Sequence, residues 1–97
     1  MARYVILMNL TEQGVKDIKN APARIEQAAK SLEAAGGKML EFYTVMGPYD
    51  YVVIAEGPSD EVALAQLIGL GMGGNVRTTA LKAFTREEFA AILSMLP

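Results

Sequence analysis

The apolar residues of this chain fall into two kinds of segment, and the order of these segments predicts the fold. Four segments are almost continuously apolar or β-prone, which is typical of strands: 3–10, 38–46, 49–56 and 75–84. Three segments carry apolar residues at helical spacing and predict helices: 22–35, the stretch from Ser59 to Leu70, and the stretch after Thr85. Strands and helices therefore alternate along the whole chain.

Local signals mark where the predicted helices begin and end. The pair Gly36-Gly37 predicts the end of the first helix, because glycine accepts the left-handed backbone of a helix C-terminus. Ser59 has the side chain of an N-cap for the second helix. Thr85 and Glu88 have the spacing of a capping box, which makes residue 85 the clearest helix start in the chain.

The second helix is apolar almost all round over 62–70, so we expect it to be heavily buried. The glycines between 69 and 74 are expected to end it. Their spacing formally matches Gly-x-Gly-x-x-Gly, but here a helix precedes and a strand follows. Phosphate binding needs the glycines between a strand and a helix N-terminus, so we interpret 69–74 as a connection and not as a dinucleotide site.

The predicted order is β-α-β-β-α-β with an added C-terminal helix, which is the order of an α+β, ferredoxin-like domain. The chain has 97 residues, of which 52% are apolar and 21% charged, and it contains no low-complexity tract. We therefore expect one domain over 1–97.

Both faces of the predicted sheet are apolar, which predicts association. Right-handed crossovers place the two internal helices on one face, yet residues of both parities are apolar in 5–10, 40–46 and 51–55. The other face needs a cover, either from the terminal helix or from a second subunit. We favour a homodimer or a multiple of dimers, stacked sheet against sheet, with a cavity between sheet and helices.

The composition excludes several kinds of chemistry. The chain has no Cys and no His, so disulfides, thiolate nucleophiles, His-based metal sites and Ser-His-Asp catalysis cannot be built from it. No Asp-x-Asp-x-Asp-Gly loop points to a carboxylate site for a metal. We expect no metal and no cofactor, and any catalysis would rest on Asp, Glu, Tyr, Lys or Arg.

Charge and hydropathy also bear on partners and location. The formal net charge is −2, with acids and bases interleaved, so there is no basic field for nucleic acid. The apolar stretch 3–10 is too short to cross a bilayer and lacks a small-residue cleavage site. We expect a cytoplasmic protein that binds neither nucleic acid nor membrane.

The segment Gly47-Pro48-Tyr49-Asp50 has a structural and a functional interpretation. Structurally it is a tight turn in which Pro48 presets the backbone and the Asp50 carboxylate bonds nearby amides. Functionally, Tyr49 and Asp50 could orient a ligand or exchange a proton, with Tyr49 as donor and Asp50 as base. The structural interpretation holds unless Asp50 is buried and unpaired.

Three further residues are candidates for ligand binding. Arg77, at the start of the fourth strand, could hold a carboxylate or phosphate, and Lys38 is a weaker candidate at the matching end of the second strand. Solvated strand-end charges are the commoner outcome for both. Tyr43 could line an aromatic cavity, although such a residue can equally fill a core.

Several of these motifs resemble the GYD-domain family, named for its Gly-x-Tyr-Asp motif. The residues that carry the resemblance are Gly47–Asp50 with the following strand 51–56, Gly36-Gly37-Lys38, Gly57-Pro58 and Gly74–Thr78. The chain departs from the family at Ala80, where a hydroxyl or polar residue often stands. The resemblance implies a dimeric α/β-barrel without an established activity, related in shape to cofactor-free monooxygenases and amino-acid-sensing domains.

Three functions follow as hypotheses. The first is a homodimeric module that binds or senses a small apolar or carboxylated molecule in a closed pocket containing Arg77, Tyr49 or Tyr43. The second is a cofactor-free isomerase or monooxygenase that uses Asp50 and a tyrosine. The third is a structural interaction subunit without a ligand cavity. We rank binding above catalysis, because no His is present and no pair of acids replaces it.

Overall fold

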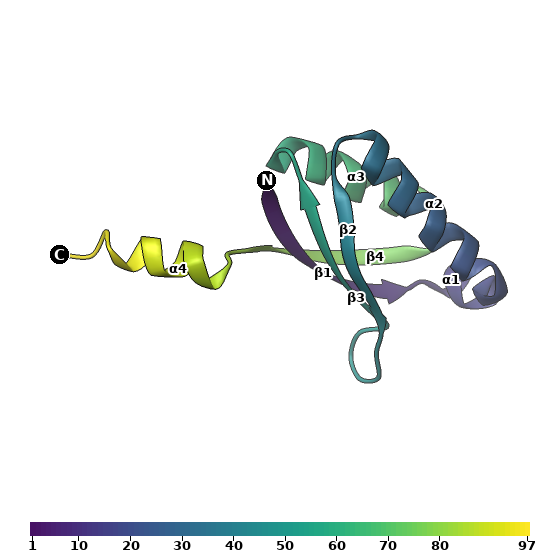
Figure 1. Cartoon of the computed structure of the whole chain (residues 1–97). Helices are drawn as coiled ribbons and strands as arrows, with labels where there is room; N and C mark the ends of the chain where they lie inside the picture. Colours follow the sequence, from purple (N-terminus) through teal and green to yellow (C-terminus); the bar gives the residue numbers. More distant parts are fainter.

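The computed structural model describes all residues, 1–97, as one mixed α+β unit (Figure 1). Its elements follow one another as β1 (Ala2–Leu10), α1 (Glu12–Lys16), a 3-10 turn (Ile18–Asn20), α2 (Ala21–Ala34), β2 (Lys38–Thr44), β3 (Tyr51–Gly57), α3 (Asp60–Met72), β4 (Val76–Ala83) and α4 (Arg86–Leu93). The predicted strands and helices are all present. The short helix α1 was not predicted, because the sequence at 11–14 indicated only an interruption of the strand.

The four strands form one antiparallel sheet in the order β2-β3-β1-β4. β1 lies in the middle, between β3 and β4, so β2 and β4 are the two edges. Helices α2 and α3 lie on the same face of this sheet (Figure 1). This arrangement is consistent with the predicted ferredoxin-like fold.

The core lies between the sheet and the two helices. Alternate residues of the two central strands point into it and are buried, namely Tyr4, Ile6, Met8, Tyr51, Val53 and Ala55. Because side chains alternate along a strand, Val5, Leu7, Val52 and Ile54 point to the opposite face and are only half-buried. The sheet therefore has one covered face and one open face.

The predicted helix caps are present as hydrogen bonds. The amides of Gly36 and Gly37 donate to the carbonyls of Glu33 and Leu32, both at 2.9 Å, and Gly36 has φ of +92°. These two bonds form a Schellman motif that ends α2. Ser59 accepts a bond from the amide of Val62, as predicted for an N-cap. The predicted capping box at the start of α4 is also present.

The prediction that α3 is heavily buried was wrong. No residue of α3 is buried, and Leu64, Ile68 and Met72 are 58%, 56% and 82% exposed. Only one side of the helix rests on the sheet, where Ala63, Leu67 and Leu70 pack against the core. The helix also continues past two glycines and ends after Met72, where Gly74 has φ of +80°. A uniformly apolar sequence does not bury a helix that has no neighbour on its outer side.

Helix α4 does not cover the open face of the sheet. It projects away from the body beyond the end of β4, and the molecule extends 53 Å along its longest axis (Figure 1). Its apolar residues are exposed, among them Phe89 at 57% and Leu93 at 47%. The sequence allowed two covers for this face, the terminal helix or a second subunit. In this structure the terminal helix does not cover it. None of the helices combines the length and apolar character needed to cross a membrane.

Candidate functional site

An apolar cavity of about 490 Å³ lies between the sheet and helices α2 and α3. Tyr4 and Leu10 both line it, so it extends about 20 Å along β1 at roughly 3.3 Å per residue. Hydrophobic residues contribute 18 of its 27 lining residues. An apolar pocket therefore lies between the sheet and the helices as predicted, but it is partly open to solvent and not closed.

The floor of the cavity is formed by the sheet and its walls by the two helices. The floor residues are Tyr4, Ile6, Met8, Leu10, Met39, Phe42, Tyr51, Val53, Ala55 and Val76. Phe42 and Tyr51 contact each other with ring centroids 5.0 Å apart. Ile25, Ala28 and Leu32 come from α2, while Leu67 and Leu70 come from α3. The aromatic pair and two methionines give this floor both a rigid and an adaptable part.

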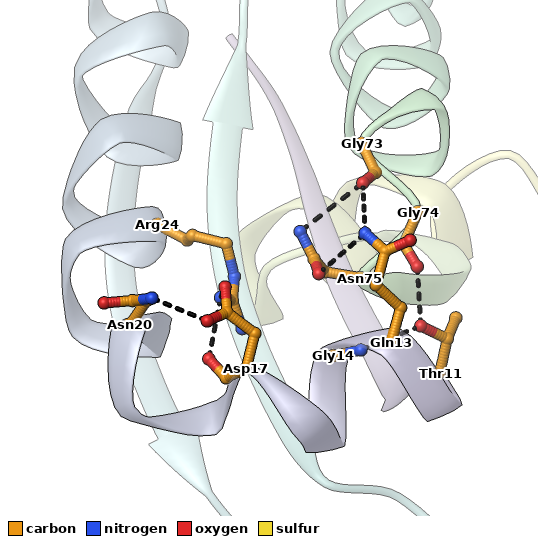
Figure 2. Close-up of polar contacts among 9 residues, drawn as sticks. All are labelled: Thr11, Gln13, Gly14, Asp17, Asn20, Arg24, Gly73, Gly74 and Asn75. Carbon is orange, nitrogen blue, oxygen red and sulfur yellow. Dashed lines mark hydrogen bonds and ion pairs between the residues drawn. The ribbon is translucent and has the colours of Figure 1, made fainter.

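Two polar contacts lie along the helices that border the cavity. Ser31 of α2 donates a hydrogen bond to the Gln66 side-chain carbonyl of α3 at 3.1 Å, and both residues line the cavity. Arg24 also lines it, and its guanidinium donates to the backbone carbonyl and the carboxylate of Asp17 at 2.9 and 2.7 Å (Figure 2). Arg24 is the only cationic side chain among the residues that line the cavity.

Beside one end of the cavity lies a charged cluster, of which only the buried Tyr4 lines the cavity. The Tyr4 hydroxyl donates a hydrogen bond to the Asp60 carboxylate, and Lys82 donates to the same carboxylate at 3.0 Å. The bond to Asp60, together with burial, raises the pKa of Tyr4 to about 12. The bonds from Tyr4 and Lys82 lower the pKa of Asp60. Tyr4 is therefore a neutral hydrogen-bond donor whose proton is held by an ionised carboxylate.

A second polar cluster joins α1 to the connection between α3 and β4. Gln13 donates to the Gly73 carbonyl at 3.1 Å and to the Asn75 side chain at 3.2 Å (Figure 2). Thr11 donates to the Gly74 carbonyl, and its hydroxyl also caps α1 by accepting from the amide of Gly14. These bonds hold the glycine-rich connection 73–75, which follows a helix and precedes a strand as predicted, so it lacks the context of a phosphate loop.

The Asp50 carboxylate has a structural partner. It accepts a hydrogen bond from the amide of Leu10 at 2.9 Å, while the amide of Asp50 donates to the Met8 carbonyl at 2.9 Å. The carbonyl of Asp50 accepts from the amide of Val45, so the loop 45–50 is closed and joined to the end of β1. Asp50 is half-buried and paired, and neither it nor Tyr49 lines the cavity. These bonds match the structural interpretation of the motif.

The other three predicted site residues also lie outside the cavity lining. Tyr43 is 52% exposed on the open face, and its hydroxyl donates to Glu41 at 3.2 Å, which raises its pKa. Arg77 and Lys38 are exposed and form no ion pair. Arg77 stands opposite Asn9, at the end of the sheet where Asp50 binds Leu10.

Lys38 lies at the other end of the sheet, opposite Glu56. The expectation that Lys38 and Arg77 share one end was wrong, because β2 and β4 run in opposite directions in the order β2-β3-β1-β4. The structure thus brings Arg77 and Asp50 to one end of the sheet and leaves Lys38 apart from them.

Sequence reasoning missed Tyr4 and the role of Asp60. Tyr4 has the same parity on β1 as Ile6 and Met8, which identifies its face but not its partner. Asp60 follows the N-cap Ser59 and was assigned only to the first turn of a helix. Their contact joins residues 56 positions apart, and only the docking of α3 across β1 and β4 creates it.

Comparison with known proteins places the chain in a family. It is 29% identical over 94 residues to a Thermus thermophilus protein named glutamine synthetase and cystathionine beta-lyase binding protein, covering 96% of this chain and 99% of that one. It shares its fold with MtbAldR, at TM-score 0.67 and 15% identity over 88% of this chain, and spans about half, 52%, of that protein. FFRP-DM1 has TM-score 0.58 and 22% identity, with 87% of this chain and all of that one covered. The GYD domain model matches residues 4–93, so this chain belongs to the GYD-domain family.

Proposed function

We propose that this chain is a small-molecule-binding or sensing module that holds an elongated, largely apolar ligand between its sheet and helices α2 and α3. The cavity of about 490 Å³ is the observation that supports this function. Its volume lies within the range of roughly 300–1,000 Å³ that is usual for ligand pockets. Its lining combines many apolar side chains with few polar ones, which is also usual for such pockets.

The polar side chains limit the ligand class. Arg24 offers a cation at the α2 wall, whereas the one carboxylate among the lining residues, Glu56, is paired with Arg3 at 3.4 Å. An apolar molecule with one carboxylate fits this distribution, because the carboxylate can share the guanidinium that Asp17 now holds. The alternative of proton transfer by Asp50 and Tyr49 lacks comparable support, since neither residue lines the cavity.

The ligand proposal is tested with a cavity-filling variant. Ala28 lines the cavity, so Ala28→Phe places a ring inside it, whereas Ala23 is exposed on the same helix and does not line it. With 8-anilinonaphthalene-1-sulfonate as the probe, we expect Ala28→Phe to weaken binding about tenfold or more and Ala23→Phe to leave it unchanged. Equal binding by both variants would contradict the proposal. Native mass spectrometry of the purified protein then identifies any molecule that copurifies with it.

The module is proposed to act as a homodimer through the open face of the sheet. Val5, Leu7, Val52 and Ile54 form an apolar layer there, and α4 of the same chain does not cover it. Two such faces can stack at about 10 Å and bury each other. We expect Ile54→Lys to halve the mass in sedimentation velocity, while Met46→Lys, in the exposed loop 45–50, leaves it unchanged. An unchanged mass for Ile54→Lys, with a folded spectrum, contradicts this interface.

One observation favours a second function, the binding of another protein. The Thermus thermophilus relative is named for binding glutamine synthetase and cystathionine beta-lyase, and it aligns over nearly its whole length. Interferometry with these two purified enzymes, at concentrations up to tens of micromolar, tests this function directly. Binding that persists in Ala28→Phe would show that it does not need the cavity.

A further inference from the structure

A second, polar pocket lies where β4 begins, beside the last turn of α3. Only one of the six residues that line it is hydrophobic, and none is acidic: they are Thr11, Gly71, Gly74, Val76, Arg77 and Thr78. Val76 is the only residue that this pocket shares with the apolar cavity. The two pockets are therefore distinct, and the second one suits a polar, negatively charged molecule.

Arg77 is the cation of this pocket, and its guanidinium forms no ion pair. Five of the nine Lys and Arg side chains pair with a carboxylate, and Arg77 is one of the four that do not. Of these four, Lys19, Lys38, Arg77 and Arg86, only Arg77 lines either pocket. A guanidinium presents its N–H groups in a planar fork that matches a carboxylate or a phosphate. Arg77 therefore has donors available for an oxyanion.

Two further kinds of donor lie beside Arg77. The hydroxyl of Thr78 lines the same pocket. β4 pairs with β1 alone, and successive residues of an antiparallel edge strand direct their backbone groups alternately toward the neighbouring strand and away from it. At least one backbone amide within 76–78 therefore points outward. Arg77 and Thr78 leave β4 toward opposite faces, so the pocket lies across the edge, and the long Arg77 side chain supplies the reach.

The wall opposite β4 is held in place by α1 and the residue before it. The amide of Thr11 donates to the Asn75 carbonyl at 3.0 Å, and the Thr11 hydroxyl donates to the Gly74 carbonyl (Figure 2). α1 packs directly on this connection, since a Cβ on Gly14 would lie 2.1 Å from the Asn75 carbonyl oxygen. The pocket is thus formed before any ligand enters, which lowers the cost of ordering it on binding.

The C-terminal end of α3 does not oppose an anion here. Free carbonyls at a helix C-terminus carry partial negative charge and would disfavour one. In this structure the amides of Gly73 and Gly74 donate to the carbonyls of Gly69 and Gly71 at 3.3 and 3.1 Å, and Gln13 donates to the Gly73 carbonyl. These donors occupy carbonyls of the last helical turn and its connection, so Arg77 is the only charged group in the pocket lining.

We propose that this pocket is an oxyanion site, in which Arg77 binds the carboxylate or phosphate of a small polar molecule together with the Thr78 hydroxyl and an outward amide of β4. The site is separate from the apolar cavity and does not depend on what the cavity binds. Ala28→Phe, which fills the cavity, should therefore bind an oxyanion as the wild type does. Failure at one site is thus distinguishable from failure at the other.

Titration with inorganic phosphate at constant ionic strength, followed by NMR of the isotope-labelled protein, tests the site. We expect saturable shifts of the amides of 74–78. Arg77→Gln should raise the dissociation constant about tenfold or more, because the charge-assisted bonds are lost. Arg86→Gln removes another exposed, unpaired cation that lies outside both pockets, so it should leave the dissociation constant unchanged.

Two further measurements identify the anion and the second donor. A parallel titration with acetate shows whether the site takes carboxylates, phosphates or both. Thr78→Val keeps the branched shape of the side chain and should raise the dissociation constant about threefold, through the lost hydroxyl. The dispersion of the amide spectrum verifies that each variant is folded.

Saturable binding of either anion that weakens in Arg77→Gln and not in Arg86→Gln supports the site. Absence of saturation with both anions would overturn it. Wild-type affinity in Arg77→Gln would overturn it as well, as would shifts of equal size around Arg86, since anions would then gather at any exposed cation.

Discussion

The two faces of the sheet have similar apolar sequences but very different environments. On β3, Val53 points toward the helices and is 2% exposed, whereas its neighbour Val52 points to the open face and is only half-buried. Two tyrosines show the same contrast, since Tyr51 lies in the core and Tyr43 on the open side of β2. Hydrophobicity alone did not decide which face became the core. The topology did, because both crossovers carry their helices to one side.

The largest difference in stability is expected between variants of the two tyrosines. Tyr51→Ala removes a buried ring that contacts Phe42, so it should lower the free energy of unfolding by about 3–5 kcal/mol. Tyr43→Ala removes an exposed ring and should cost less than about 1 kcal/mol in the monomer. Urea unfolding at low protein concentration measures both. Equal losses would mean that the open face is as well packed as the core within one chain.

The adjacent valines give a smaller and more closely matched comparison. Val53→Ala should cost about 2 kcal/mol, from the lost methyl groups and the space they leave. Val52→Ala should cost about half of that in dilute solution, and its cost should rise with protein concentration if a second copy covers the open face. Thermal unfolding across a hundredfold range of concentration distinguishes the two cases. A cost for Val52→Ala that does not change with concentration argues against the stacked dimer.

A pH dependence arises from the charged cluster on the covered face. The pKa of Asp60 is lowered in the folded state, so its contribution to stability is present above its ordinary value and is lost as the pH falls through the lowered one. Wild-type protein should therefore lose stability on acidification below about pH 4. The Asp60→Asn variant should lose less stability over the same range. Thermal melts between pH 2 and 7 measure this, with Glu61→Gln as the control in the same helix turn. If wild type and Asp60→Asn lose melting temperature in parallel as the pH falls, the acid-induced loss of stability does not come from Asp60.

The contact between Tyr4 and Asp60 also makes the stability of the protein fall at high pH. The pKa of Tyr4 is raised to about 12, so its neutral form is favoured in the folded protein. The resulting stability is complete below the ordinary tyrosine value of about 10 and is lost as the pH rises from there toward 12. Tyr4→Phe should remove this alkaline loss, while Tyr43→Phe on the open face should change it less. Ultraviolet difference titration of the tyrosines follows the ionisation directly.

The smallest single effect is expected at Gly69 of α3, which contrasts with Gly37 at the end of α2. A Cβ on Gly69 of α3 would have no atom within 4 Å, so Gly69→Ala should stabilise the helix by about 0.5–1 kcal/mol. At Gly37 a Cβ would lie 2.6 Å from a Leu32 carbon and against the Glu56 carbonyl, so Gly37→Ala should destabilise by about 1–3 kcal/mol. Chemical denaturation measures both changes. A loss at Gly69 would show a close neighbour there that the single chain lacks.

Much of the fold could be predicted because its signals are local. The capping box at Thr85, the N-cap at Ser59 and the Schellman pair at Gly36-Gly37 each involve residues within a few positions of one another. The candidate site was predicted less well. The sequence suggested the cavity but not its lining, because the lining residues come from six elements whose side chains meet only after the helices dock.

The sequence by itself determined the four strands, the three longer helices, their predicted caps, the ferredoxin-like order and the GYD family. These properties depend on residue spacing and on short-range hydrogen bonds, which are readable along the chain. Only the tertiary structure decided that Asp50 binds the amide of Leu10, that Tyr4 meets Asp60, and that α3 and α4 expose apolar surfaces. These outcomes depend on strand direction and on which side of the sheet the helices occupy. A hydrophobic pattern shows that a surface should be covered, but not which neighbour covers it.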